Sequence, residues 1–179
     1  YSDFLDVFRM LPPTEDMASV ALAGEVKRGW YKRSAKAILR LFGHEAPRFT
    51  ALLAALSPRT DVETNLANAL EIWARWKEAG RPTTRAAILR IMADALPGKQ
   101  GEDFTTWHNN TVLALSAEDP GTITLSGPKV NSFMANLRGD VNEVTNDAWM
   151  ASYALVHQKL FAGLKRDGKT VKGPGYIAM

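Results

Sequence analysis

Apolar residues recur every three to four positions along most of the chain, which is the spacing of amphipathic helices. Residues 49–56 are apolar on nearly all sides and are expected to form a buried helix. No alternation of period two is sustained and no internal repeat is present. The pattern therefore predicts an all-α fold.

Prolines and glycines divide this pattern into separate helices. Three of the expected helices run from Val26 to Phe42, from Thr60 to about Ala79, and from Tyr153 to about Leu164. In the second, Thr60 and Glu63 have the spacing of a capping box. The residues expected on its core side share an apolar character and helical spacing: Val62, Leu66, Ala69, Leu70, Ile72, Trp73 and Trp76.

The segment from Leu125 to Tyr153 combines a tight turn with two helix starts. Gly127 can take the positive φ of a narrow turn, and Pro128 suits the first position of a helix. Gly139 and Asp140 are expected to end that helix.

After a polar loop, Thr145 is a candidate N-cap for the next helix. That cap would put Asn146 and Asp147 in the first turn, where a carboxylate meets free N–H groups. Asp147 is thus a candidate functional acid, with the alternative that it only complements the helix dipole.

The composition is that of one globular domain or two helical lobes that share a cleft. A net charge of +3 and a pI near 9.2 agree with a polyanionic partner without demanding one. The chain has no cysteine and three well-separated histidines, which argues against thiolate sites, iron–sulfur clusters and a histidine metal cluster. We therefore expect no metal and no cofactor. No apolar run approaches the roughly 20 residues of a membrane span, so no membrane partner is expected.

Several polar and aromatic residues are candidates for ligand contact. Trp30 and Tyr31 beside Lys32 could stack a base and hold a phosphate. For Asn65 a satisfied interhelical hydrogen bond is about as plausible as a ligand contact, and Arg59 could be an exposed loop charge. Asn110 marks the polar edge of a helix expected over residues 104–115.

The run Thr124-Leu125-Ser126-Gly127-Pro128-Lys129, followed by a helix and then by Val144-Thr145-Asn146-Asp147, resembles the helix-hairpin-helix motif and aspartate of the helical DNA glycosylase superfamily. The separation from Lys129 to Asp147 is 147 − 129 = 18 residues, similar to glycosylases with both a Schiff-base lysine and an aspartate. The resemblance implies a glycosylase-like fold of two helical lobes around a cleft. It implies one domain over residues 1–179, with the motif and its aspartate at 123–153.

A narrower resemblance is to the phage-encoded alpha-glutamyl/putrescinyl-thymine pyrophosphorylases, or amino acid:DNA transferases. Four runs carry it: Gly29-Trp30-Tyr31-Lys32, Ala54-Ala55-Leu56-Ser57-Pro58-Arg59 with Asn65, Ser126-Gly127-Pro128-Lys129-Val130 with Phe133 and Asn136, and Val144-Thr145-Asn146-Asp147. The group transfers an amino acid or polyamine onto pyrophosphorylated 5-hydroxymethyluracil in DNA and releases pyrophosphate. The implied partners are double-stranded DNA with modified thymine and an amine co-substrate, in the cytoplasm of a phage-infected bacterium.

The resemblance also implies roles for individual residues. Asp147 and Lys129 would be catalytic. The substrate and the pyrophosphate would be bound by Trp30, Tyr31, Lys32, Ser57, Arg59, Asn65, Asn110 and Asn146. The DNA backbone would be bound by Ser126, Gly127, Lys129 and Val130.

Two other functions remain open at this point. One is a DNA glycosylase or lyase in which Lys129 is the amine nucleophile and Asp147 stabilises the cationic sugar. The other is a non-catalytic helix-hairpin-helix module, for which Asp147 would be dispensable.

Overall fold

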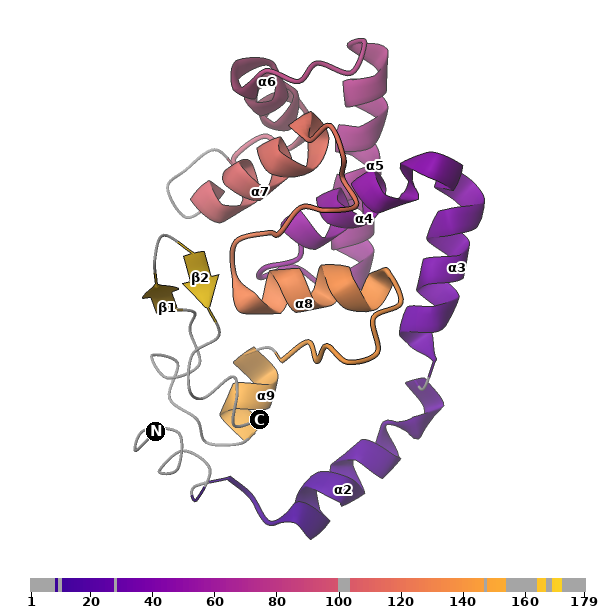
Figure 1. Cartoon of the computed structure of the whole chain (residues 1–179), viewed down its shortest axis with the longest axis vertical. Coiled ribbons are helices and arrows are strands. Elements are labelled where there is room, and N and C mark those ends of the chain that lie inside the picture. Colours follow the sequence, from indigo (N-terminus) through magenta and orange to yellow (C-terminus); the bar gives the residue numbers. More distant parts are fainter. Residues whose placement is uncertain are drawn as a thin grey trace.

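The computed structural model describes residues 9, 11–27, 29–99, 104–146, 148–153, 164–166 and 169–171. The α-helices in these ranges are α2 (Thr14–Ala23), α3 (Trp30–Phe42), α4 (Ala46–Ala55), α5 (Val62–Glu78), α6 (Arg85–Ala95), α7 (Thr105–Ser116), α8 (Pro128–Leu137) and α9 (Ala148–Tyr153) (Figure 1). Two 3-10 turns, η1 (Glu25–Lys27) and η2 (Gly43–Glu45), flank α3. The predicted all-α class is confirmed.

A short hairpin is the exception to the helical architecture. Strand β1 (Leu164–Arg166) pairs antiparallel with β2 (Lys169–Val171), with Lys165 opposite Thr170. Residues 154–163, over which a helix was expected to run to about Leu164, lie outside the described residues, and Leu164 itself is the first residue of β1.

Helix α4 is the centre of the fold, with α3, α5, α7 and α8 packed around it (Figure 1). Phe49, Leu52 and several alanines of α4 have no solvent exposure, which confirms the predicted buried helix. Against it, the ring of Phe42 stacks on that of Phe49 at 3.7 Å, and Trp73 meets both rings edge-on at 5.5 Å. This contact joins α3, α4 and α5 into one core.

Two expected helix boundaries differ in the structure. Asp61, not Thr60, caps α5, because its side chain accepts the N–H of Thr64 at 2.9 Å. The Thr60 hydroxyl instead donates to the carbonyl oxygens of Leu56 and Pro58. The helix expected over residues 26–42 is broken at Gly29, whose φ of 77° is left-handed, so α3 begins only at Trp30.

Helix α2 extends away from the central helices, as Figure 1 shows at the bottom of the view. It has no buried residue, and its Val20 and Leu22 are exposed. It leads through η1 and Gly29 into α3. Within the described ranges, no helix is both long and apolar enough to cross a membrane.

The start of α8 confirms the predicted turn. Gly127 has a φ of 98°, and Pro128 is the first residue of the helix. The helix ends at Leu137, followed by Gly139 with a φ of 97°. The predicted roles of Gly127 and Pro128 at the start of α8, and of Gly139 after its end, are thus confirmed.

The loop between α7 and α8 is held in place by Arg138. Its guanidinium donates to the carbonyl oxygen of Pro120 at 2.5 Å and to that of Gly121 at 3.2 Å. Burial lowers the pKa of Arg138, and the nearby Asp119 carboxylate acts in the opposite direction. The end of α8 therefore fixes the loop that leads into its own start.

Candidate functional site

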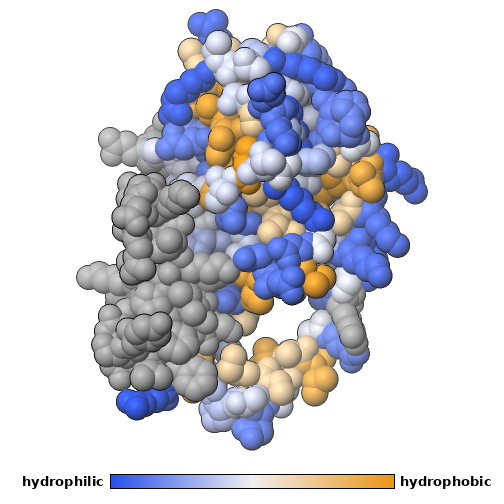
Figure 2. All heavy atoms as spheres, viewed as in Figure 1, coloured by the Kyte–Doolittle hydropathy of each residue, from blue (hydrophilic) through white to orange (hydrophobic). Residues whose placement is uncertain are grey.

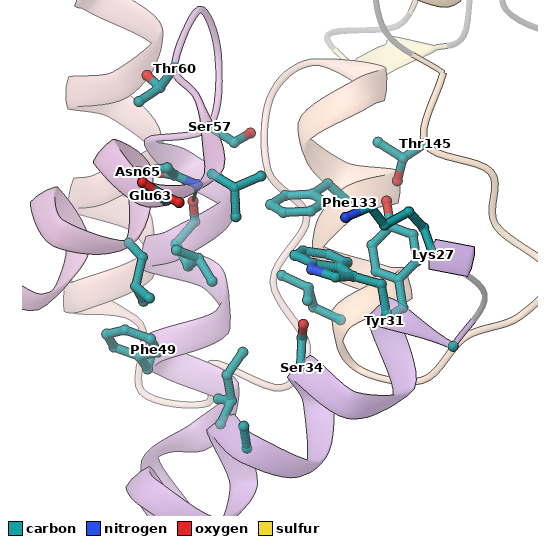
Figure 3. A pocket seen from close by; sticks show the side chains of 18 of the residues that line it. Lys27, Tyr31, Ser34, Phe49, Ser57, Thr60, Glu63, Asn65, Phe133 and Thr145 are labelled. Atoms are coloured by element: carbon teal, nitrogen blue, oxygen red, sulfur yellow. Dashed lines mark hydrogen bonds between the residues drawn. The ribbon is translucent and has the colours of Figure 1, made fainter. Parts of the chain in front are cut away.

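A cleft of about 1260 Å³ lies between the α4–α5 side of the molecule and the α3–α8 side. Ala21 and Leu22 of α2 form part of its border, and Figure 2 shows the opening between this segment and the rest of the molecule, with apolar residues on both sides. This volume is somewhat above the roughly 300–1,000 Å³ that is usual for small-molecule pockets, so the cleft is large enough to hold a ligand. Segments far apart in the sequence supply its lining, as Figure 3 shows.

Three aromatic rings form a continuous surface on the α3–α8 side of the cleft. Trp30 stacks on Phe133 with centroids 6.3 Å apart and an interplanar angle of 17°. Tyr31 meets Trp30 edge-on at 5.1 Å and Phe133 at 6.0 Å. All three side chains are partly buried and line the cleft, so they give this side of it an aromatic surface of the kind on which a flat ligand can stack.

Lys129 joins the two sides of the cleft. Its Nζ donates to the hydroxyl of Ser57 at 3.1 Å and reaches the carbonyl oxygen of Ser57 at 3.4 Å. The same Nζ lies 5.4 Å from the centroid of the Phe133 ring. The predicted site residues Lys129 and Ser57, 72 positions apart, are therefore brought together beside the aromatic surface.

Asn65 lies on the opposite, α5 side, and is 4% exposed. Its Nδ2 donates to the carbonyl oxygen of Leu53 at 3.1 Å, which fixes the orientation of the amide. Its Oδ1 is buried and has no hydrogen-bond partner within the described part of the chain. One half of the amide thus makes an interhelical bond, one of the two alternatives expected for this residue, and the other half is a buried acceptor that presents almost no surface to the cleft.

The hairpin before α8 differs from the prediction for a DNA-backbone contact. Ser126 donates its N–H to Asn110 Oδ1 at 2.8 Å, and Asn110 Nδ2 donates back to the Ser126 carbonyl oxygen at 2.9 Å. Leu125 donates its N–H to the side chain of Asn131. The Ser126 N–H is already satisfied, and Val130 is buried. Asn110 is not among the residues that line the cleft; its amide holds the hairpin.

The predicted cations are not gathered in the cleft. Lys32 and Arg59 are exposed and lie outside its lining, whereas Lys129 is part of it. The structure adds Lys27, which was not among the candidates from the sequence; Figure 3 shows it on the side of Tyr31 and Thr145. The cationic character of the cleft therefore comes from Lys27 and Lys129.

The loop after α8 is tied back to that helix by Asn136. This side chain donates to the carbonyl oxygens of Asp140 at 2.9 Å and Glu143 at 2.7 Å, and it accepts the Thr145 hydroxyl at 2.7 Å. Thr145 thereby reaches the cleft, and the neighbouring Asn146 is buried at 3% exposure. Asp147 lies outside the described residues, so its predicted role stays a prediction.

Sequence reasoning missed the apolar part of the cleft. Val62, Leu66 and Leu70 were expected in the core, but they are 61%, 43% and 44% exposed and line the cleft. Periodicity alone could not separate them from the true core residues Ala69, Ile72, Trp73 and Trp76, because a cleft wall and a core wall have the same spacing.

Residues 17–168 match the family of unknown function DUF7178. The chain belongs to this family. No curated protein and no solved structure matches the chain. In the ranges that the structure describes, no group of three or more His, Cys, Asp or Glu side chains is placed to hold a metal ion.

Proposed function

We propose that the cleft modifies a base in DNA, transferring an amino acid or other amine onto pyrophosphorylated 5-hydroxymethyluracil with release of pyrophosphate. The observation that carries this proposal is the position of Lys129, whose Nζ lies beside Ser57 and the Phe133 ring. A base removed from its stack needs an aromatic surface, and a departing pyrophosphate needs a cation next to it. Both are present in this one cleft.

The proposed step is a substitution at the methylene carbon of the base. The amine nitrogen forms a bond to that carbon, the bond from carbon to the pyrophosphate oxygen breaks, and the electron pair leaves with pyrophosphate. The ammonium must lose a proton, for which the sequence resemblance suggests Asp147 as the acceptor. Lys129 and Lys27 would stabilise the negative charge that develops on the leaving group.

A glycosylase or lyase is the second candidate, because it too would use an amine at the position of Lys129. In that reaction the neutral Nζ attacks the sugar carbon and the base leaves. The hydrogen bond from Lys129 to Ser57 and the adjacent aromatic surface suit either reaction.

The non-catalytic DNA-binding module has less support. Such a module needs free hairpin N–H groups and an outward lysine, whereas the Ser126 N–H is bound to Asn110 and Lys129 is directed to Ser57. The observations thus favour the cleft over the hairpin as the functional part of the chain.

The decisive experiment supplies duplex DNA containing pyrophosphorylated 5-hydroxymethyluracil together with a panel of amines. We expect pyrophosphate release and a mass gain on the base. Lys129→Met should lower turnover by roughly a hundredfold, since removing one group that stabilises the transition state costs about that much. The matched control is Lys36→Met, because Lys36 is an exposed lysine of α3 outside the cleft lining, and this variant should keep its turnover.

Other products would select another function. A released free base, or an adduct at Lys129 trapped by borohydride, would establish the glycosylase or lyase. DNA binding without either reaction would refute the proposal and leave the non-catalytic module.

A further inference from the structure

An apolar stripe runs along the α5 wall of the cleft. Val62, Leu66 and Leu70 are spaced four residues apart on this helix, so they lie on one face. Leu41 of α3 is 73% exposed and also lines the cleft, as does Leu22 of α2 at 69%. Large apolar side chains exposed together around one cleft mark a binding surface for an apolar group.

This stripe is distinct from the aromatic surface. At about 1.5 Å per residue, Val62 and Leu70 are about 12 Å apart along the helix axis. The aromatic rings belong to α3 and α8, and Figure 3 shows Phe133 and Tyr31 across the pocket from the α5 residues Glu63 and Asn65. A base stacked on the rings therefore leaves the stripe for a second ligand.

The stripe has a polar end at Glu63. This residue belongs to the first turn of α5, next to Val62, and it lines the cleft with an exposed carboxylate. Leu66 and Leu70 follow three and seven residues later, so they lie on the same side of α5 as Glu63. A carboxylate at the end of an apolar stripe suits a positively charged nitrogen that carries an apolar chain.

We propose that this half of the cleft binds a primary amine carrying an apolar chain, with its ammonium at Glu63 and its chain along Leu66 and Leu70. This inference rests on the proposed function, and it specifies the class of the amine co-substrate. A diamine is disfavoured, because its second ammonium would lose water against Leu66 and Leu70, and the residues of α5 that line the cleft include no carboxylate other than Glu63.

The test measures binding of three small probes to the full chain by calorimetry, with no DNA present. Hexylamine has both the ammonium and the apolar chain, hexan-1-ol lacks the charge, and 1,4-diaminobutane replaces the apolar end with a second charge. We expect hexylamine to bind at least about tenfold more tightly than either of the other two, since both the chain and the charge contribute.

Matched variants locate the site. Leu66→Ser should weaken hexylamine binding roughly three- to tenfold, because it removes apolar surface from the wall. Leu39→Ser is the control, since Leu39 is 62% exposed on α3 and does not line the cleft. Glu63→Gln should weaken hexylamine and leave hexan-1-ol unchanged.

Three results would overturn the inference: equal binding of 1,4-diaminobutane and hexylamine, equal hexylamine affinity in Leu66→Ser and wild type, or self-association that Leu66→Ser abolishes while no probe binds. The last result would assign the stripe to a second copy of the chain. Failure of the proposed function is separable, because a chain that binds hexylamine but transfers no amine to DNA refutes only the transfer reaction.

Discussion

Replacing Asn110 with leucine tests whether this residue holds the hairpin or contacts a ligand. Asn110 is 1% exposed, and both polar atoms of its amide bind the backbone of Ser126, at 2.9 Å and 2.8 Å. Leucine has the same number and branching of side-chain heavy atoms, although its methyl groups are bulkier than an amide, and it forms neither hydrogen bond. Asn110→Leu therefore removes the contact between α7 and the turn that starts α8.

The expected cost follows from these two bonds. One neutral hydrogen bond contributes about 1 kcal/mol, and a buried group left without a partner costs roughly 1–3 kcal/mol. Because Ser126 itself is exposed, water can replace part of what its backbone loses. We expect the free energy of unfolding to fall by roughly 1–3 kcal/mol in total.

Urea unfolding, followed by circular dichroism and tryptophan fluorescence, measures this change. The control is Asn109→Leu, because Asn109 is exposed and accepts only an exposed hydrogen bond from Arg85 at 2.8 Å. That variant should stay within about 0.5 kcal/mol of wild type. Unchanged stability of Asn110→Leu, combined with loss of turnover, would refute the structural role and return Asn110 to the ligand-binding set.

Two further predictions concern helix starts. Gly127→Ala should lower the free energy of unfolding by about 1–3 kcal/mol, because the φ of 98° is unfavourable for a residue with a side chain. The added Cβ would lie 3.7 Å from the nearest side-chain atom, an ordinary contact, so the cost comes from the backbone conformation. Ser126→Ala keeps the backbone hydrogen bonds of the turn and should not change the stability. Equal melting temperatures for these two variants would show that the turn tolerates a side chain. The hydrogen bond from the Thr64 N–H holds the pKa of Asp61 below its ordinary value of 3.8. The Asp61 carboxylate therefore stabilises the folded state above pH 3.8, and this stabilisation is lost as the pH falls through the lower pKa of the folded state. Wild type should therefore melt above Asp61→Ala at pH 7, and the gap should close in acid; a gap independent of pH would contradict the capping role.

The elements that local chemistry specifies could be predicted from the sequence. The turn at Gly127 and the helix start at Pro128 depend on backbone conformations that few other residues adopt, and the apolar run of α4 has no polar side to expose. By contrast, Gly29 breaks the helix expected over 26–42 through a left-handed conformation that a mid-pattern glycine permits but does not require.

The site depends on contacts between distant segments, which is why only part of it could be predicted. Ser57 and Lys129 were each candidates, but their contact joins positions 72 apart. Lys32 and Arg59 carry the same positive charge as Lys129, and only the fold places Lys129 in the cleft and the other two outside it. The Thr60 hydroxyl donates to the carbonyl oxygen of Leu56 at the end of α4, and Asp61 caps α5 in its place. Such a contact with the preceding helix is not visible in the capping-box spacing.

The turn before α8 and the cleft are connected through the first turn of α8. Asn110 holds the backbone of Ser126 by hydrogen bonds just before this helix, and Lys129 reaches Ser57 from the first turn of the helix itself. Phe133 follows one helical turn after Lys129, so whatever fixes the hairpin also fixes the ring on which a base would stack. A turn that binds the DNA backbone needs N–H groups that are free to donate to phosphate oxygens. Here those of Leu125 and Ser126 are bound to asparagine side chains, and the turn serves to aim Lys129 and Phe133 into the cleft.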